Sequence, residues 1–180
     1  MTNFNAAQCI QRIESGDVRA FSEIVSHYRK MVFTLVIKIV DNREDAEDIT
    51  QEIFIKVFRV LGQFKGDSEF STWLYRIAYN TTLSEIRKRK PVFVPIEENY
   101  TYEGEPKTDV LENEDRLHLL DKALKLLPPD EALLISLFYM NDRKIDDISK
   151  ITSLSVANVK VKLHRIRKKL MVTINQLMRE

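Results

Sequence analysis

Apolar residues recur every three or four positions through most of this 180-residue chain, and this spacing constrains its fold more than any other feature. Residues three or four apart lie on one face of an α-helix. Three such stripes occupy the first half, at 21–39, 49–61 and 70–78. Only 4 Gly and 5 Pro interrupt the chain, which favours long helices over a turn-rich sheet. The sequence predicts an all-α protein that begins with a helical bundle over about residues 10–90.

An acidic segment divides the chain in two. Pro91 is expected to end the third helix, and Pro95 and Pro106 disfavour helix beyond it. Residues 91–116 carry 8 acidic and 2 basic side chains, whereas residues 117–180 carry 7 acidic and 12 basic ones. We therefore expect a domain over 1–90, an acidic linker over 91–113 and a basic domain over 114–180.

The second half has the pattern of a helix-turn-helix. A leucine stripe over 117–127 stops at Pro128-Pro129, and Asp130 is expected to cap the next helix. A short helix with Ile145, Ile148 and Ile151 follows, then a turn at 152–154, and Ser155 is a favourable N-cap for a long final helix. Two helices joined by a short turn, the second strongly basic, are typical of DNA-binding proteins.

The final helix is predicted to bury the stripe around Leu163 and to expose a cationic face. At about 100° per residue, Val161, His164, Arg165 and Lys168 point away from Leu163. An outward valine gains nothing from water but could contact a thymine methyl group. An ordinary solvated basic face is the alternative, and the preceding short helix and turn favour DNA binding over it.

Several functional classes are disfavoured. Cys9 is the only cysteine, so no internal disulfide is expected and a reducing compartment is indicated. No apolar run approaches the ~20 residues that span a bilayer, so we expect a cytoplasmic protein that does not cross the membrane. The three histidines lack metal-ligand spacing and no Gly-rich phosphate loop is present, so we expect no metal, no cofactor and no enzyme.

Two stretches resemble a known family. Residues 45–59, DAEDITQEIFIKVFR, and 64–80, FKGDSEFSTWLYRIAYN, resemble the second conserved region of extracytoplasmic-function (ECF, group four) sigma factors. Residues from LPP at 127–129 through NVKVKLHRIR at 158–167 resemble their fourth region. The order of the two regions and the acidic linker between them match as well. The resemblance implies a protein that binds core RNA polymerase and directs promoter-specific initiation.

The resemblance also implies a docking helix. The helix over 45–59 would bind the clamp helices of the polymerase's largest subunit through Asp48, Gln51, Glu52 and Phe54. Carboxylates and an amide offer acceptors to a basic partner, and an exposed Phe54 would add an apolar anchor. The alternative is an ordinary acidic helix start with Phe54 in the core.

The loop before the third stripe resembles the family's reader of the minus-ten element, which captures a flipped base as the duplex opens. The implied contacts come from seven residues: Phe64, Lys65, Gly66, Asp67, Ser68, Arg76 and Asn80. Phe70 and Trp73 could stack on bases, but their helical spacing favours the core. The basic run 87–90 would follow the DNA backbone.

The minus-thirty-five element would be read by the last helix. The resemblance places Lys160, Val161 and His164 at base-reading positions. It places Asn158, Lys162, Arg165 and Arg167 on phosphates, and Lys168 lies on the same basic face. The family often has a small residue at the position of Val161 and an arginine at that of Lys162, so the promoter sequence stays open.

Partners follow from the same resemblance: core RNA polymerase, promoter DNA and an anti-sigma factor, which in this family is often membrane-anchored. The acidic linker would thread the polymerase cleft, or act as a plain tether. The rival interpretation is a conventional helix-turn-helix regulator whose N-terminal half binds a ligand or dimerises. Such a regulator would bind its DNA tightly without polymerase.

Overall fold

The computed structural model describes residues 4–40, 42–89 and 113–179, and within these ranges every regular element is a helix. The order is α1 to α4, then α5 to α8, with a short 3₁₀ turn, η1, after α3. The predicted all-α fold is confirmed. The linker predicted over 91–113 lies almost wholly outside the described residues, as does Lys90 of the basic run.

Helices α1 to α4 form an N-terminal bundle. Their bounds are α1 Ala6–Glu14, α2 Ala20–Ile37, α3 Arg43–Val60, η1 Leu61–Gln63 and α4 Phe70–Arg89. The stripes predicted from spacing supply the core, where Ile24, Leu35 and Ile53 have no exposed surface. Asn42 caps α3 by accepting a hydrogen bond from the Asp45 backbone N–H at 2.7 Å, and Glu44 and Asp45 occupy the first turn.

None of the predicted stripes covers residues 6–14, where the structure has α1. The sequence of α1 nevertheless contains a helix N-cap and apolar residues that become buried. Asn5 caps it by accepting from the Gln8 backbone N–H at 3.2 Å, and its apolar side chains Cys9 and Ile10 are buried. With nine residues, α1 depends on packing against α2 rather than on propensity.

Helices α5 to α8 form a C-terminal bundle, with bounds α5 Asn113–Lys125, α6 Pro129–Tyr139, α7 Ile145–Thr152 and α8 Val156–Leu177. The expectation that Asp130 caps α6 is wrong. Pro128 is the N-cap and Pro129 the first helical residue, a position that suits a residue without a backbone N–H. The helix-turn-helix is present: α7 ends at Ser153, with φ 60°, and Ser155 caps α8 by accepting from the Asn158 N–H at 3.2 Å.

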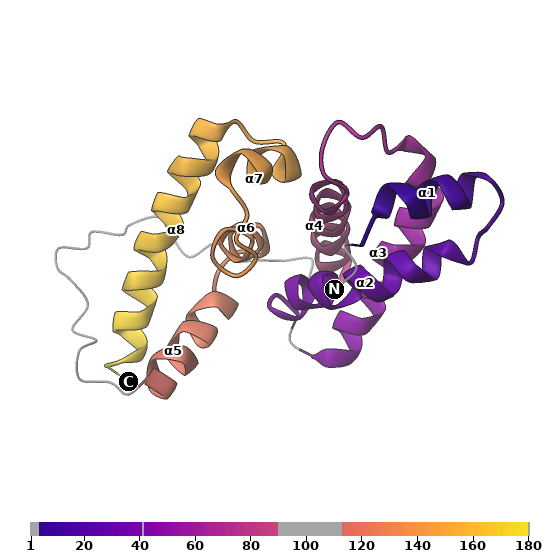
Figure 1. Cartoon of the computed structure of the whole chain (residues 1–180). Coiled ribbons are helices and arrows are strands. Elements are labelled where there is room, and N and C mark those ends of the chain that lie inside the picture. Colours follow the sequence, from indigo (N-terminus) through magenta and orange to yellow (C-terminus); the bar gives the residue numbers. More distant parts are fainter. Residues whose placement is uncertain (1–3, 41, 90–112, 180) are drawn as a thin grey trace.

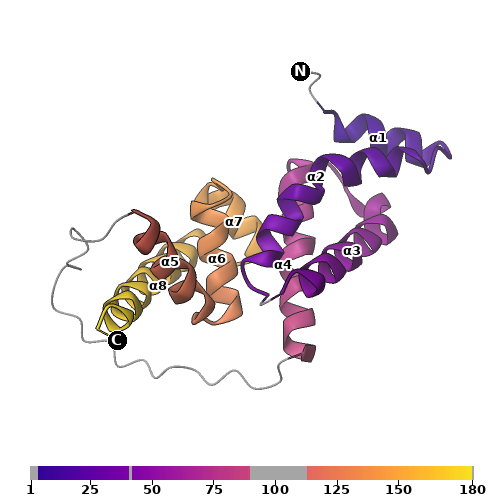
Figure 2. The same cartoon turned by 90° about the horizontal axis from the view of Figure 1, so that it is seen from below.

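The two bundles lie side by side (Figure 1). Helices α6 and α7 rest against α4, while α8 covers the other side of α6 and α7 (Figures 1 and 2). The contact between α4 and α7 is among the most extensive in the described part of the chain. None of the described helices has the length and apolar character that a membrane span requires.

Candidate nucleic-acid interface

Helix α8 presents the cationic face that its sequence predicts. Val159, Leu163 and Ile166 are buried against the rest of the C-terminal bundle. On the opposite face, Lys160, His164, Arg165 and Lys168 are exposed, and none of these four forms an ion pair with another described residue. Val161 is 49% exposed among them, and Asn158 is exposed in the first turn. An uncompensated row of cations on one helix face suits a polyanion.

Two of the predicted phosphate contacts are engaged elsewhere. Lys162 is half-buried and its Nζ lies 3.2 Å from Oδ2 of Asp130 on α6. Arg167 donates from Nε to the Tyr139 hydroxyl at 2.6 Å, and its guanidinium lies 5.7 Å from the Phe138 ring centre and 5.4 Å from that of Tyr139. These contacts brace the sides of α8 against α6. The exposed α8 cations that have neither contact are therefore Lys160, Arg165 and Lys168.

The loop between η1 and α4, which contains most of the predicted minus-ten residues, packs through Phe64 on the aromatic side chains of α4. Phe64 is half-buried, with its ring centre 5.3 Å from that of Phe70 and 5.4 Å from that of Trp73. Phe70 is only 6% exposed, which confirms the core assignment made for it. Gly66 has φ +77°, a left-handed conformation that residues with a Cβ rarely adopt. The loop thus turns sharply and leaves Lys65 and Asp67 exposed, with Ser68 half-buried.

Helix α4 continues this surface. Arg76 and Asn80 are exposed one turn apart, and the Asn80 side chain donates from Nδ2 to the Arg76 carbonyl at 2.9 Å. Arg87, Lys88 and Arg89 form the basic last turn. Arg89 is paired with Asp45 at the start of α3, and Lys88 with Glu85. The loop and helix α4 therefore each expose polar side chains that the sequence assigned to the minus-ten element.

Helix α3 exposes three of the four residues predicted for polymerase docking. Asp48, Gln51 and Glu52 lie on its outer face. The expectation that Phe54 is an exposed anchor is wrong, because it is 6% exposed and packs inward with Ile53 and Val57. The exposed apolar side chains are instead Ile55 (38%) and Phe58 (43%), at helical spacing from Gln51 and Glu52. The same helical periodicity predicts that Ile55 and Phe58 lie on the solvent-facing side of α3, so these two residues could have been predicted from the sequence.

A second apolar surface, not predicted from the sequence, lies on the C-terminal bundle. Helices α5, α6 and α8 enclose a groove of about 420 Å³, lined almost entirely by carbon, with Leu120, Ile135, Met171 and Ile174 among its walls. Tyr139 at its edge is 55% exposed. An exposed apolar groove of this kind commonly marks an interaction site.

Each of the two bundles matches a known protein family. Residues 24–92 match the family described as Sigma-70 region 2, and residues 117–170 match the family described as Sigma-70, region 4. The chain belongs to the ECF sigma factors. It is 31% identical to RNA polymerase sigma-H factor of Pseudomonas aeruginosa, over 100% of this chain and 99% of the relative. It is 33% identical to the ECF sigma factor SigW of Bacillus subtilis, over 93% and 96%.

Two solved structures share the fold. One is the sigma factor RpoE of Bartonella quintana in complex with the anti-sigma factor NepR, with TM-score 0.64, 21% identity and coverage of 87% of this chain and 98% of that one. The other is CnrH in complex with the cytosolic domain of CnrY, with TM-score 0.67, 22% identity and 95% of each chain covered.

The family fixes the general function. As an ECF sigma factor, this protein binds core RNA polymerase and promoter DNA and directs transcription initiation. The family predicted from the sequence is confirmed, and the conventional regulator is not favoured, because region 2 accounts for most of the N-terminal bundle. Sigma factors are not a family of catalytic enzymes.

Proposed function

We propose that this sigma factor reads its promoter with two separate surfaces while a third holds the polymerase. The domain over 1–90 would bind polymerase and the minus-ten element, and the domain over 114–180 the minus-thirty-five element, with residues 91–113 joining them. The observation that carries the proposal is the face of α8, where the exposed side chains Lys160, His164, Arg165 and Lys168 surround a half-exposed valine.

The α8 surface suits the major groove of duplex DNA, which is about 12 Å wide and admits one helix. Lys160 and His164 lie one turn apart and can reach base edges, and Val161 between them suits a thymine methyl group. Arg165 and Lys168 continue the face and would neutralise phosphates, with Asn158 at the amino end of the helix. Lys162 and Arg167 would reach phosphates from the flanks by exchanging their contacts with Asp130 and Tyr139.

The minus-ten surface suits unpaired bases. Gly66 lets the backbone of the loop approach a strand closely, and Asp67 and Ser68 can hydrogen-bond a base edge. Lys65 and Arg76 supply phosphate contacts, and Asn80 can contact a base from α4. Phe64 serves mainly to hold the loop, because its ring packs on Phe70 and Trp73.

Polymerase docking would use the outer face of α3. Asp48, Gln51 and Glu52 offer acceptors, and Ile55 and Phe58 replace Phe54 as the apolar anchors. Phe54 contributes indirectly, since it fixes the helix from beneath. Phe58 is itself held by an edge contact with Phe21, whose ring centre lies 5.0 Å away, so this anchor is positioned before it binds.

We further infer a regulatory partner of the anti-sigma class. Both structural neighbours were solved in complex with another protein: RpoE with the anti-sigma factor NepR, and CnrH with the cytosolic domain of CnrY. The apolar groove between α5, α6 and α8 could bind the apolar face of an amphipathic helix from such a partner. We also infer that the chain acts in the cytoplasm, where RNA polymerase works, and that it catalyses no reaction of its own.

Run-off transcription on a randomised promoter library tests the assignment of surfaces. The wild-type chain with core polymerase should select one motif near minus ten and another near minus thirty-five. A chain with Lys160→Ala and His164→Ala should relax the upstream motif alone, and Lys65→Ala with Asn80→Ala the downstream motif alone. Loss of both motifs with either pair would contradict two separate readers.

A further inference from the structure

A row of aromatic side chains connects the segment before α1 with the loop between η1 and α4. Phe4, which precedes the N-cap of α1, has its ring centre 5.6 Å from that of Tyr28 on α2. The Tyr28 ring centre lies 5.4 Å from that of Phe70, the first residue of α4. The Phe70 ring centre lies 5.3 Å from that of Phe64, the first residue of the loop. We call Phe4, Tyr28, Phe70 and Phe64 the aromatic row.

The contacts within the row have geometries that aromatic rings favour. The ring planes of Phe4 and Tyr28 meet edge to face at 83°. Those of Phe70 and Phe64 meet edge to face at 85°. His27 joins the row at its Phe4 end, where the two rings stack with their centres 4.1 Å apart and their planes at 11°. Such aromatic pairs contribute to stability beyond the area that they bury, so each ring of the row resists displacement of the next.

Helix α1 fixes the position of Phe4 on α2. The side chains of Cys9 and Ile10 are only 4% and 7% exposed, and they pack α1 onto the N-terminal bundle. Nη1 of Arg12, in the last turn of α1, lies 2.8 Å from Oε1 of Glu23 on α2. Apolar packing and an ion pair thus attach this helix, and Phe4 directly precedes its N-cap. The aromatic row therefore begins at an anchored helix.

The other end of the row is the loop that carries most of the proposed minus-ten residues. The ring centre of Trp73 lies 5.4 Å from that of Phe64 and 5.5 Å from that of Phe70, so the three rings form one cluster. Lys65 directly follows Phe64, and Gly66 turns the backbone with φ +77°. The place where Phe64 packs therefore sets the starting point and the direction of the loop.

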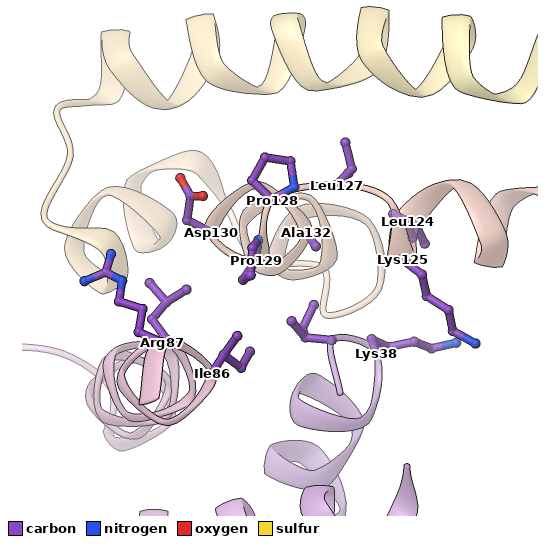
Figure 3. Close-up of a pocket in the computed structure, with 12 residues that line it drawn as sticks. Lys38, Ile86, Arg87, Leu124, Lys125, Leu127, Pro128, Pro129, Asp130 and Ala132 are labelled. Carbon is purple, nitrogen blue, oxygen red and sulfur yellow. The ribbon is translucent and has the colours of Figure 1, made fainter. Parts of the chain in front are cut away.

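The opposite face of α4 packs on the C-terminal bundle. At about 100° per residue, Tyr75 and Ile86 lie on the side of this helix that faces away from Phe70. The Tyr75 ring centre lies 4.7 Å from the guanidinium of Arg143. A pocket of about 230 Å³ remains between Ile86 and Pro129 (Figure 3). The aromatic row lies wholly within the N-terminal bundle, so it holds the loop without help from the C-terminal bundle.

We propose that Phe4 and Tyr28 are positioning residues for recognition of the minus-ten element, because the aromatic row fixes where the loop presents its polar side chains to unpaired bases. This inference rests on the proposed function, since the loop is the proposed minus-ten reader. A residue that only positions the loop alters base selection without contacting a base. Removing the ring of Phe4 should therefore lower discrimination among minus-ten sequences by about two- to tenfold, the factor that corresponds to the loss of one aromatic pair.

Fluorescence of the free full chain tests whether the row reaches the loop. Trp73 is the only tryptophan in the sequence, and it is half-buried beside Phe64, so its quenching by acrylamide reports on the ring cluster. Phe4→Leu and Tyr28→Leu each remove a ring of the row at a distance from Trp73. Each should raise the quenching constant of Trp73 by about twofold or more, because a less fixed Phe64 exposes the indole.

The matched control is Phe33→Leu, which removes another half-buried ring of α2. Phe33 packs against Arg43 at the start of α3, with the guanidinium 5.7 Å from the ring centre, and it has no place in the aromatic row. Its loss should leave the quenching of Trp73 unchanged. Tyr28→Phe keeps the ring and should match wild type. Urea unfolding confirms that each variant is folded, and Phe4→Leu alone decides the test if Tyr28→Leu does not fold.

Run-off transcription on the randomised promoter library tests the consequence for promoter choice. Phe4→Leu should lower discrimination at the minus-ten motif by about two- to tenfold, while the minus-thirty-five motif and the affinity for core polymerase stay at the wild-type level. Phe4→Tyr retains a ring and should restore the minus-ten discrimination.

Three results with Phe4→Leu would each overturn the positioning role: unchanged quenching of Trp73, an unchanged minus-ten motif, or equal loss of both motifs. A wild-type chain that selects no minus-ten motif would instead count against the proposed function. The two failures are distinguishable, because the quenching measurement on the free chain does not need polymerase.

Discussion

The ammonium group of Lys162 on α8 lies 3.2 Å from the carboxylate of Asp130 on α6. One cation of the DNA-binding helix is therefore already paired within the chain, and phosphate would have to displace Asp130. A lysine–aspartate pair with both side chains about 40% exposed contributes little to stability, so the exchange costs little.

Replacing that carboxylate should strengthen DNA binding. In Asp130→Asn, Lys162 no longer has a charged partner and becomes available to phosphate. The salt dependence of promoter binding by the assembled polymerase should steepen by about one unit in the logarithmic slope. Glu14→Gln on α1 removes a charge far from α8 and serves as the control. Equal slopes for Asp130→Asn and wild type would mean that Lys162 does not reach DNA.

Substitutions of base-reading and of phosphate-binding residues on α8 should have different effects on DNA binding. His164→Ala or Lys160→Ala should change which upstream base is preferred, by about 1–3 kcal/mol of discrimination. Lys168→Ala should weaken all upstream sequences alike, because a phosphate contact carries no base information. Competition binding with single-base variants of the selected motif gives both quantities. An unchanged preference in the His164 and Lys160 variants would move the base readers elsewhere.

Phe54 and Ile55 are adjacent in sequence but should behave oppositely when truncated. Phe54→Ala removes a buried ring and should lower the free energy of unfolding by about 3–5 kcal/mol. Ile55→Ala removes an exposed side chain, so stability should change by less than about 0.5 kcal/mol while affinity for core polymerase falls. Urea unfolding and titration of core polymerase measure the two effects. Loss of affinity without loss of stability in Phe54→Ala would contradict this division.

The buried hydroxyl of Tyr79 should make the free energy of unfolding fall at alkaline pH. Burial raises the pKa of its hydroxyl from 10.0 to about 12. The unfolded chain therefore loses this proton first as pH rises, and the native state loses stability between pH 10 and about 12 by up to about 1.4 kcal/mol per pH unit. Tyr79→Phe should flatten this part of the profile relative to wild type in urea titrations. Parallel profiles would place the alkaline loss on other groups.

Much of this architecture could be predicted because helices obey short-range rules. The stripes over 21–39, 49–61 and 70–78 predicted three helices and most of the core of the N-terminal bundle, and the cap at Ser155 predicted the start of α8. The outward face of α8 followed from the same periodicity. The prediction that Phe54 is exposed was wrong because it rested on the family motif alone. Phe54 lies on the same inward side of α3 as Ile53 and Val57, and this position on the helix determines its burial.

The contacts between the bundles could not be predicted in this way. Arg143 and Tyr75 are 68 positions apart, and no periodicity relates a turn residue to a helix in another bundle. The pairing depends on the left-handed turn at Asp142 and on how α6 and α7 rest against α4. The α5–α6–α8 groove was missed for a similar reason, since its walls come from three helices that only the tertiary fold brings together.

Promoter-dependent transcription with purified core RNA polymerase tests the central claim most directly. The full chain, free of any inhibitor, should co-elute with core polymerase in size-exclusion chromatography and yield a run-off product from its selected promoter, while Gln51→Ala with Ile55→Ala should reduce both. A chain that binds its DNA tightly alone, never co-elutes with core polymerase and gives no promoter-dependent product would contradict the account.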